Sequence, residues 1–177
     1  MPLRLALLLL VASLSVGCVS SGSDSPLQTG KGRDEARAAY VQLGLGYLRQ
    51  GLSEQAKVPL QMALALDNHD ADANAALALV FQAQAEPELA DQYYRKALAV
   101  RPHDPRLLNN YGSFLFQQER YKQASGYFQQ AATDTLYPER SRVFENLGVT
   151  SVRLGQREDA RQQLEKALHL NQRQPRA

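Results

Sequence analysis

The sequence predicts an all-α protein built from four helix–turn–helix repeats, and three observations support this fold class. Apolar and small residues recur in the same order four times after Asp34, at spacings of 34, 34 and 36 residues. Glycines and prolines fall between the expected helices, where chain reversals are needed. The composition, with 44% hydrophobic and 21% charged residues, suits one compact unit or a short repeat array.

The recurrence keeps the same kinds of side chain at fixed places. A large apolar residue comes first and a small one follows it: Leu43-Gly44, Leu77-Ala78, Tyr111-Gly112 and Leu147-Gly148. Further along each repeat stand an alanine, a large residue and a second alanine: Ala56, Leu60 and Ala63; Ala90, Tyr94 and Ala97; Ala124, Phe128 and Ala131; Ala160, Leu164 and Ala167. Small residues let two antiparallel helices approach closely while the large ones fill the space around them. This pattern resembles the tetratricopeptide repeat, whose helix pairs stack into a superhelix.

Placing Leu43 at the seventh position of that repeat sets the repeat boundaries. The four repeats then run over 37–70, 71–104, 105–138 and 141–174, within a predicted array of 37–174. The two extra residues lie in Thr133 to Arg140, which we expect to form a longer connection.

Single glycines and prolines predict where each helix begins or ends. Gly51 and Gly155 stand where a left-handed helix C-cap is expected. Pro87 suits the first turn of a helix, and Pro102 ends repeat two. Pro59 falls inside the second helix of repeat one, where it removes a hydrogen bond, so we expect it to bend that helix.

The N-terminus predicts an export signal. Arg4 precedes an apolar run of about 10 residues, which is too short to span a bilayer. An ordinary signal peptide cut near Gly17 would leave Cys18 incidental. The stretch Leu14-Ser15-Val16-Gly17-Cys18 instead resembles a bacterial lipobox, which implies a signal peptide over 1–17 and a lipid-bearing Cys18.

Residues 18–36 are expected to form the lipidated N-terminus and a flexible tether, because serines and glycines dominate much of this stretch and cannot bury a core. Several acyl chains on one cysteine anchor a protein stably. By analogy with lipoprotein sorting, the Val19 that follows Cys18 points to the outer membrane, with the repeats facing the periplasm.

One side of each first helix is the candidate protein-binding groove. At about 100° per residue, positions two, five, nine and twelve of a repeat fall together, away from the contact with the second helix. In a stacked array this stripe lines the concave surface, and its apolar character is greatest at the N-terminal end. The candidate residues are Val41, Leu45, Leu48, Leu79, Asn109 and Phe116. An apolar groove of this kind accepts a peptide or an amphipathic helix from a partner.

A second interpretation of the same stripe is structural. Neighbouring first helices and the tether would then cover part of it, which would make those residues core. A substitution such as Leu45→Glu separates the two interpretations, because it weakens partner binding in the first and destroys helical content in the second.

The sequence predicts neither an enzyme nor a cofactor or metal site. His69 and His103 occupy equivalent turns, and His169 stands near the end of a helix, so no two are placed to share a metal. Neither a phosphate-binding loop nor a zinc-protease motif is present. The net charge of +2 disfavours nucleic acid as a partner, and we expect no small-molecule substrate.

Several stretches resemble one family within the tetratricopeptide-repeat proteins. They are Lys31 to Arg37, Gln42 to Leu48, Glu54 to Leu60, Asn109 to Gly112 and Asp134 to Gly148. They are similar to the type IV pilus biogenesis lipoproteins of the PilF and PilW family. Pro59 and the insertion within Thr133 to Arg140 depart from the generic repeat, and both resemble features of this family.

The resemblance implies a pilotin, in which the lipid on Cys18 brings the protein to the outer membrane and the repeats bind the pilus secretin and promote its localisation and multimer assembly. The alternative is a periplasmic scaffold lipoprotein that docks cell-wall enzymes or outer-membrane assembly machinery. Only Pro175, Arg176 and Ala177 follow repeat four, and no polar capping helix does. Similar pilotins continue further, so we expect a truncated member that self-associates through repeat four.

Overall fold

The structure is a computed structural model that describes residues 29–173. Within these bounds the chain is helical, in agreement with the predicted all-α repeat fold. The helices are α2 (Gly30–Arg49), α3 (Ser53–Leu66), α4 (Ala71–Ala83), α5 (Pro87–Val100), α6 (Pro105–Gln117), α7 (Tyr121–Ala132), α8 (Arg140–Arg153) and α9 (Arg157–Arg173).

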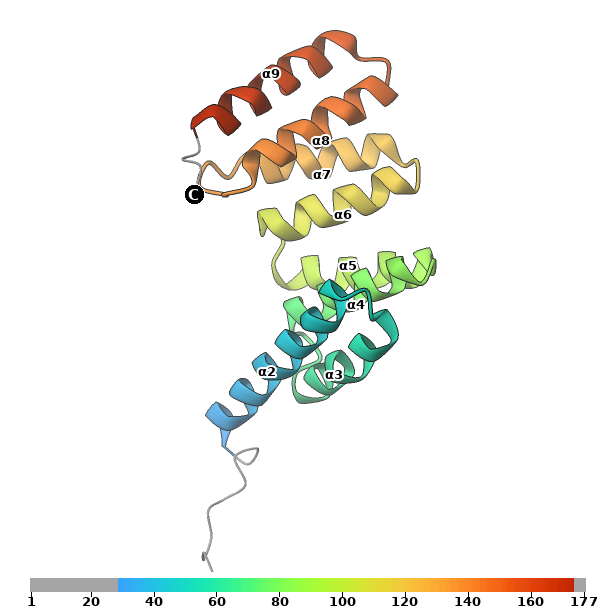
Figure 1. Cartoon of the computed structure of the whole chain (residues 1–177), viewed down its shortest axis with the longest axis vertical. Helices are drawn as coiled ribbons and strands as arrows, with labels where there is room; N and C mark the ends of the chain where they lie inside the picture. The colour runs from blue at the N-terminus through green and yellow to red at the C-terminus, as the bar shows by residue number, and fades with distance from the viewer. Residues whose placement is uncertain (1–28, 174–177) are drawn as a thin grey trace, which may run out of the picture. The chain divides into compact units, whose positions relative to one another are not determined.

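The chain divides into two units, residues 1–35 and residues 36–177. The second unit contains the helix pairs, which follow one another in chain order from α3 at one end to α9 at the other (Figure 1). The main contacts join the helices of a pair, such as α4 with α5, and also each second helix with the next first helix, such as α7 with α8. Each interior first helix is therefore covered by two second helices.

Small residues allow the close approach within each pair. The alanines of the repeated pattern are buried, and Ala56, Ala90 and Ala124 are completely so. A Cβ atom added to Gly112 would lie 2.7 Å from the Phe128 ring. The same addition at Gly44 or Gly148 would bring the Cβ within 2.6 Å of a leucine side chain. Only glycine therefore fits at these three places without displacing the opposite side chain.

The turn inside each repeat uses a left-handed residue. Gly51 and Gly155 have φ of +75°, as their positions predict. Ala85 (φ 57°) and Glu119 (φ 58°) occupy the equivalent turns of repeats two and three. A left-handed backbone is costly for a residue with a Cβ atom, so these two turns are held by the packing of the flanking helices.

The first helix begins earlier than expected. Residues up to 36 were predicted to be tether, but α2 begins at Gly30. The Thr29 hydroxyl accepts a hydrogen bond from the Gly32 amide at 3.0 Å, as a helix cap does. Lys31 and Glu35 then form an ion pair one turn apart. Helix-favouring charged residues thus continue the helix into a stretch whose glycines suggested a linker.

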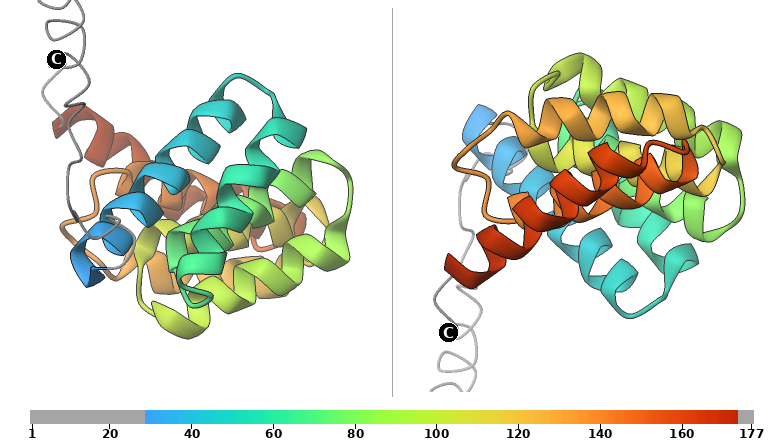
Figure 2. Two further views of the ribbon diagram at one scale, coloured as in Figure 1. Left: turned by 90° about the horizontal axis from the view of Figure 1, so that it is seen from below. Right: turned by 90° about the horizontal axis from the view of Figure 1, so that it is seen from above.

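Two large residues of the repeated pattern are exposed, one on the first described helix and one on the last. Leu43 is exposed, whereas Leu77, Tyr111 and Leu147 at the same position are buried. No described helix precedes α2 to cover Leu43. Leu164 is likewise exposed on α9, which lies nearest the viewer in the view from above (Figure 2, right).

The two departures from the generic repeat keep the helices intact. Pro59 is buried inside α3, which continues to Leu66, and the bend expected there stays a prediction. The connection between α7 and α8 covers 133–139 and is longer than the other turns between repeats, as predicted. The Arg140 guanidinium donates a 2.8 Å hydrogen bond to the Ala132 carbonyl, which closes this connection.

Candidate functional site: the open stripe on the first helices

The structure corrects two of the predicted groove residues. Val41 and Asn109, both at position five of their repeats, are 4% and 5% exposed. Val41 packs in a cluster with Ala63 and Ala73, which belong to α3 and α4. Asn109 accepts a 3.0 Å hydrogen bond from the Asn146 side chain of α8. These two residues are core, as the structural interpretation of the stripe requires.

Val41 and Asn109 are buried because the next repeat covers them. Position five faces the first helix of the repeat that follows, so Val41, Ala75 and Asn109 are buried. Glu145 occupies the same position on α8 and is exposed, since no described helix follows the last pair. The angular position of a residue on its own helix does not contain this information.

Positions nine and twelve remain accessible, and we call these residues the open stripe. They are Leu45, Leu48, Leu79, Gln82, Ser113, Phe116, Val149 and Val152. Leu45, Leu48 and Leu79 are half-buried and pack against the main core. Val149 and Val152 are 45% and 59% exposed. The exposed apolar surface is therefore greatest at the C-terminal end of the stripe, not at the N-terminal end as the composition suggested.

A cavity of about 360 Å³ lies in the open stripe between α6 and α8. Its lining residues are Ser113, Phe116, Gln117, Phe128, Asn146 and Val149. Phe116 packs edge-on against Tyr121, with ring centres 5.2 Å apart, and this contact limits the positions available to its ring. The cavity thus combines apolar walls with amide and hydroxyl groups, a mixture suited to a peptide side chain.

Polar contacts tie successive first helices together beside the stripe. The Gln82 side chain donates a 2.7 Å hydrogen bond to the Gln117 side chain, which joins α4 to α6. The Asn109–Asn146 bond joins α6 to α8 in the same way. Each bond links positions about one repeat apart, so the stripe is a continuous surface of connected helices.

A charged cluster occupies position two of the central repeats. Asp72 forms ion pairs with Arg106 and with Arg101, the latter at 2.6 Å. Burial raises the pKa of Asp72, but the hydrogen bonds from Arg106 and Arg101 outweigh it and hold that pKa below its ordinary value. Asp104 also forms ion pairs with Arg101 and Arg106, so two carboxylates balance the two guanidinium groups. This position is therefore polar, and the apolar surface available for binding lies in the open stripe.

The described residues contain no candidate metal site. His69, His103 and His169 are all exposed and lie on different turns or helices. Within residues 29–173 no cluster of His, Cys, Asp or Glu could hold a metal ion. None of the described helices is long and apolar enough to cross a membrane. Cys18, the predicted lipid-bearing residue, lies outside the described residues.

Three of the residues that line the cavity lie outside the predicted stripe. Phe128 belongs to a second helix and was assigned to the core, where it is indeed almost fully buried. Gln117 and Asn146 lie on first helices at positions thirteen and six, outside the chosen stripe. The glycine opposite Phe128 was the available signal, because Gly112 lets the ring pack closely against α6, beside this cavity.

The paired helices and the open stripe define a tetratricopeptide-repeat protein of the kind that binds other proteins. The match to tetratricopeptide-repeat families covers residues 71–104 and 142–173. The type IV pilus assembly protein PilF of Pseudomonas aeruginosa is 57% identical over 175 residues, which are 99% of this chain and 69% of that protein. The chain belongs to the PilF family of type IV pilus biogenesis proteins.

Solved structures agree with this assignment. A structure of Pseudomonas aeruginosa PilF matches with a TM-score of 0.79 and 59% identity over 82% of this chain. The structure of PilW, described as a widely conserved type IV pilus biogenesis factor, matches with a TM-score of 0.73 and 28% identity over 77% of this chain. The chain spans 65% and 63% of these two solved chains.

Proposed function

We propose that this protein is an outer-membrane pilotin of type IV pilus biogenesis, which binds the pilus secretin and promotes its localisation and assembly into multimers. The observation that carries the proposal is the 57% identity to PilF over almost the whole chain. The repeat fold supports it, because tetratricopeptide repeats bind other proteins. In this proposal the protein acts as an adaptor: a lipid on Cys18 holds it at the membrane and the repeats bind the secretin. Neither the anchoring nor the binding requires catalysis.

The open stripe is the proposed contact with the secretin. Phe116 and Val149 border a cavity that accepts an apolar side chain, and Val152 extends the apolar surface beside it. Buried apolar anchors surrounded by polar groups are typical of protein interfaces. Gln117 and Asn146 supply such polar groups at the edge of this cavity.

Removal of the gene tests the pilotin role. Outer-membrane fractions are run on a denaturing gel without heating, and the secretin is detected in them. We expect the multimer band to fall and the secretin monomer to rise in the strain that lacks the gene. Wild-type amounts of multimer in the outer membrane would refute the proposal, and would favour a scaffold that serves other envelope proteins.

The proposed anchor has a test of its own. Cys18→Ala removes the only thiol in the chain and with it the site of lipid attachment. The variant should leave the membrane fraction and appear in the soluble periplasmic fraction. Ser25→Ala, in the predicted tether outside the lipobox, is the matched control and should stay in the membrane. Continued sedimentation of Cys18→Ala with the outer membrane would show that another feature attaches the protein.

A further inference from the structure

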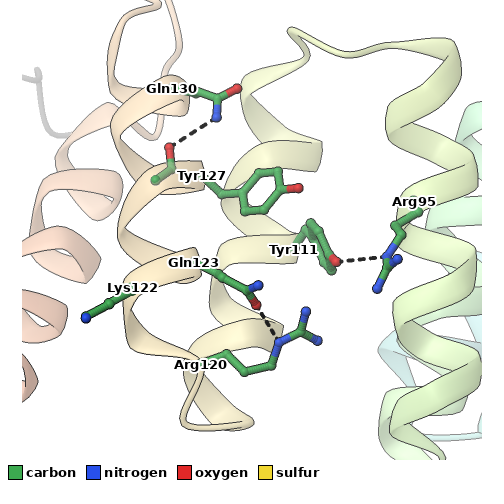
Figure 3. A pocket seen from close by; sticks show the side chains of 8 residues that line it. Arg95, Tyr111, Arg120, Lys122, Gln123, Tyr127 and Gln130 are labelled. Atoms are coloured by element: carbon green, nitrogen blue, oxygen red, sulfur yellow. Dashed lines mark hydrogen bonds between the residues drawn. The ribbon is translucent and has the colours of Figure 1, made fainter.

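A second cavity lies on the other side of the helix pairs, away from the open stripe. It has a volume of about 470 Å³ and lies between the second helices α5 and α7, with Tyr111 of α6 at its base (Figure 3). Arg95 enters from α5, and Arg120 and Lys122 come from the start of α7. It has no residue in common with the cavity that contains Phe116 and Val149.

Cationic groups outnumber carboxylates around this cavity. Asp91 accepts hydrogen bonds of 2.8 Å from the Tyr111 hydroxyl and from the Arg120 guanidinium, and it forms an ion pair with Arg95. Lys122 is exposed and forms no ion pair with any residue in 29–173. One carboxylate is thus shared by two guanidinium groups, with one ammonium group beside them, so the net charge around the cavity is about +2.

The walls of the cavity are held in place before any ligand arrives. Tyr127 packs edge-on against Tyr111, with ring centres 4.7 Å apart. The Tyr111 hydroxyl is fixed by Asp91, and the Arg120 guanidinium donates a second hydrogen bond of 2.6 Å to the Gln123 side chain. Figure 3 shows Tyr111, Arg95 and Arg120 directed toward one another. Preorganised donors of this kind lower the entropy cost of binding.

We propose that this cavity binds a carboxylate group presented by an acidic peptide segment of a partner protein. Guanidinium groups match the planar geometry of a carboxylate, and Lys122 adds a further charge at the rim. The half-buried ring of Tyr127 gives the peptide an apolar surface beside the charge. The inference goes beyond the proposed secretin contact, because it concerns a different surface and needs no assumption about the pilus.

The neighbouring charges favour a compact carboxylate over an anionic membrane surface. Glu88 and Asp91 border the adjoining hollow on α5, together with Arg95 and Lys96. Glu119 is exposed immediately before Arg120. A broad layer of anionic headgroups would meet these carboxylates and be repelled, whereas a single side chain entering the cavity would meet mainly Arg95, Arg120 and Lys122.

Gly126 provides a way to close the cavity without removing any charge. It borders the cavity, and a Cβ atom added there would meet no atom within 4 Å. Gly126→Leu should therefore fold normally while its side chain occupies the space of the ligand. Gln129→Leu is the matched control, because Gln129 is exposed on the same helix but does not line the cavity.

The test uses the full chain in detergent micelles and the capped peptide acetyl-Glu-Glu-Glu-Glu-amide, followed by NMR. We expect saturable shifts of the amides of 122–130 in the wild type and in Gln129→Leu, and none in Gly126→Leu. Lys122→Glu should weaken binding by up to about fivefold, the upper end for one exposed charge pair. Val149→Glu should bind the peptide normally, which separates this site from the proposed secretin contact.

Three outcomes would overturn the inference. The first is the absence of saturable shifts with the glutamate peptide. The second is an equal response to a neutral control peptide, acetyl-Gln-Gln-Gln-Gln-amide, which would show that the carboxylates are not recognised. The third is tighter binding of inorganic phosphate to the same residues, which would make the cavity a general anion site. None of these results bears on the secretin assay.

Discussion

Glycines contacting large side chains are the residues on which the helix pairs depend most. Gly112 lies against the Phe128 ring, and that ring is almost fully buried, so it has no free space to move into. Gly126 lies on the other face of the next helix and has open space around it. The two glycines are chemically identical but have opposite steric surroundings.

Alanine substitutions at these two glycines should therefore have opposite effects on stability. Gly112→Ala should lower the free energy of unfolding by about 1 to 3 kcal/mol through overpacking. Gly126→Ala should raise it by up to about 1 kcal/mol through helix propensity. Urea unfolding of both variants measures the difference, and equal changes would contradict the packing described for Phe128.

Asp91 gives a prediction about pH. Burial raises the pKa of Asp91. Hydrogen bonds from Tyr111 and Arg120, together with the charges of Arg95 and Arg120, lower this pKa by a larger amount, so its value in the folded protein lies below the ordinary one. A depressed carboxyl pKa contributes stability above the unfolded pKa of about 3.9, and this is lost as the pH falls through the folded value. The Asp91 network should therefore stabilise the protein at neutral pH and not in strong acid.

Asp91→Asn should lower the free energy of unfolding at pH 7 by about 1 to 3 kcal/mol, since it weakens a partly buried network. At pH 3 the difference from wild type should be smaller. Asp159→Asn, on the exposed start of α9, is the control and should have little effect at either pH. An Asp91→Asn effect that is the same at both pH values would show that the charge of this carboxylate is not what matters.

At the scale of the helices, the left-handed turn inside each repeat could be predicted from the sequence in two repeats but not in the other two. Gly51 and Gly155 could be placed in the left-handed conformation from sequence, because glycine adopts it without strain. Ala85 and Glu119 make the same turn, but nothing in these residue types signals it. Their backbone is set by the two helices that each turn joins, so only the repeat register could have revealed it.

Glu119→Gly should therefore stabilise the protein by about 1 kcal/mol, because it removes the strain of a left-handed residue that carries a Cβ atom. Glu119 is exposed, so few other contacts are lost. Gly155→Ala should have the opposite effect at the equivalent turn. Melting temperatures followed by circular dichroism check both, and a lower melting temperature for Glu119→Gly would contradict the strain inferred here.

The order of the helices was predictable, but the binding surface was only partly so. The register of Leu77, Tyr111 and Leu147 predicted buried positions on first helices, and all three are buried. Val41 and Asn109 were misplaced because one helix alone does not show what the next repeat covers. The glycines before Asp34 suggested a linker, whereas α2 begins at Gly30 because the charged residues around them favour helix.

At the scale of the second unit, neighbouring repeats decide which surfaces are accessible. Interior first helices are covered on two sides, and the most exposed apolar residues of the open stripe are Val149 and Val152, on the last described first helix. The second cavity, between α5 and α7, opens on the other side of the pairs and is cationic rather than apolar. The unit thus presents two surfaces with different chemistry, whose cavities have no lining residue in common.

We propose that the open stripe of α6 and α8 binds the secretin, and co-purification tests this contact most directly. Val149→Glu places a charge in the stripe, while Val100→Glu does so on α5; the two valines are 45% and 44% exposed. Secretin recovered with tagged full-length protein should fall about tenfold or more for Val149→Glu, because burying an unpaired carboxylate costs more than about 1.4 kcal/mol. It should stay at the wild-type level for Val100→Glu. Undiminished recovery with Val149→Glu, or an equal loss with both variants, would contradict the claim.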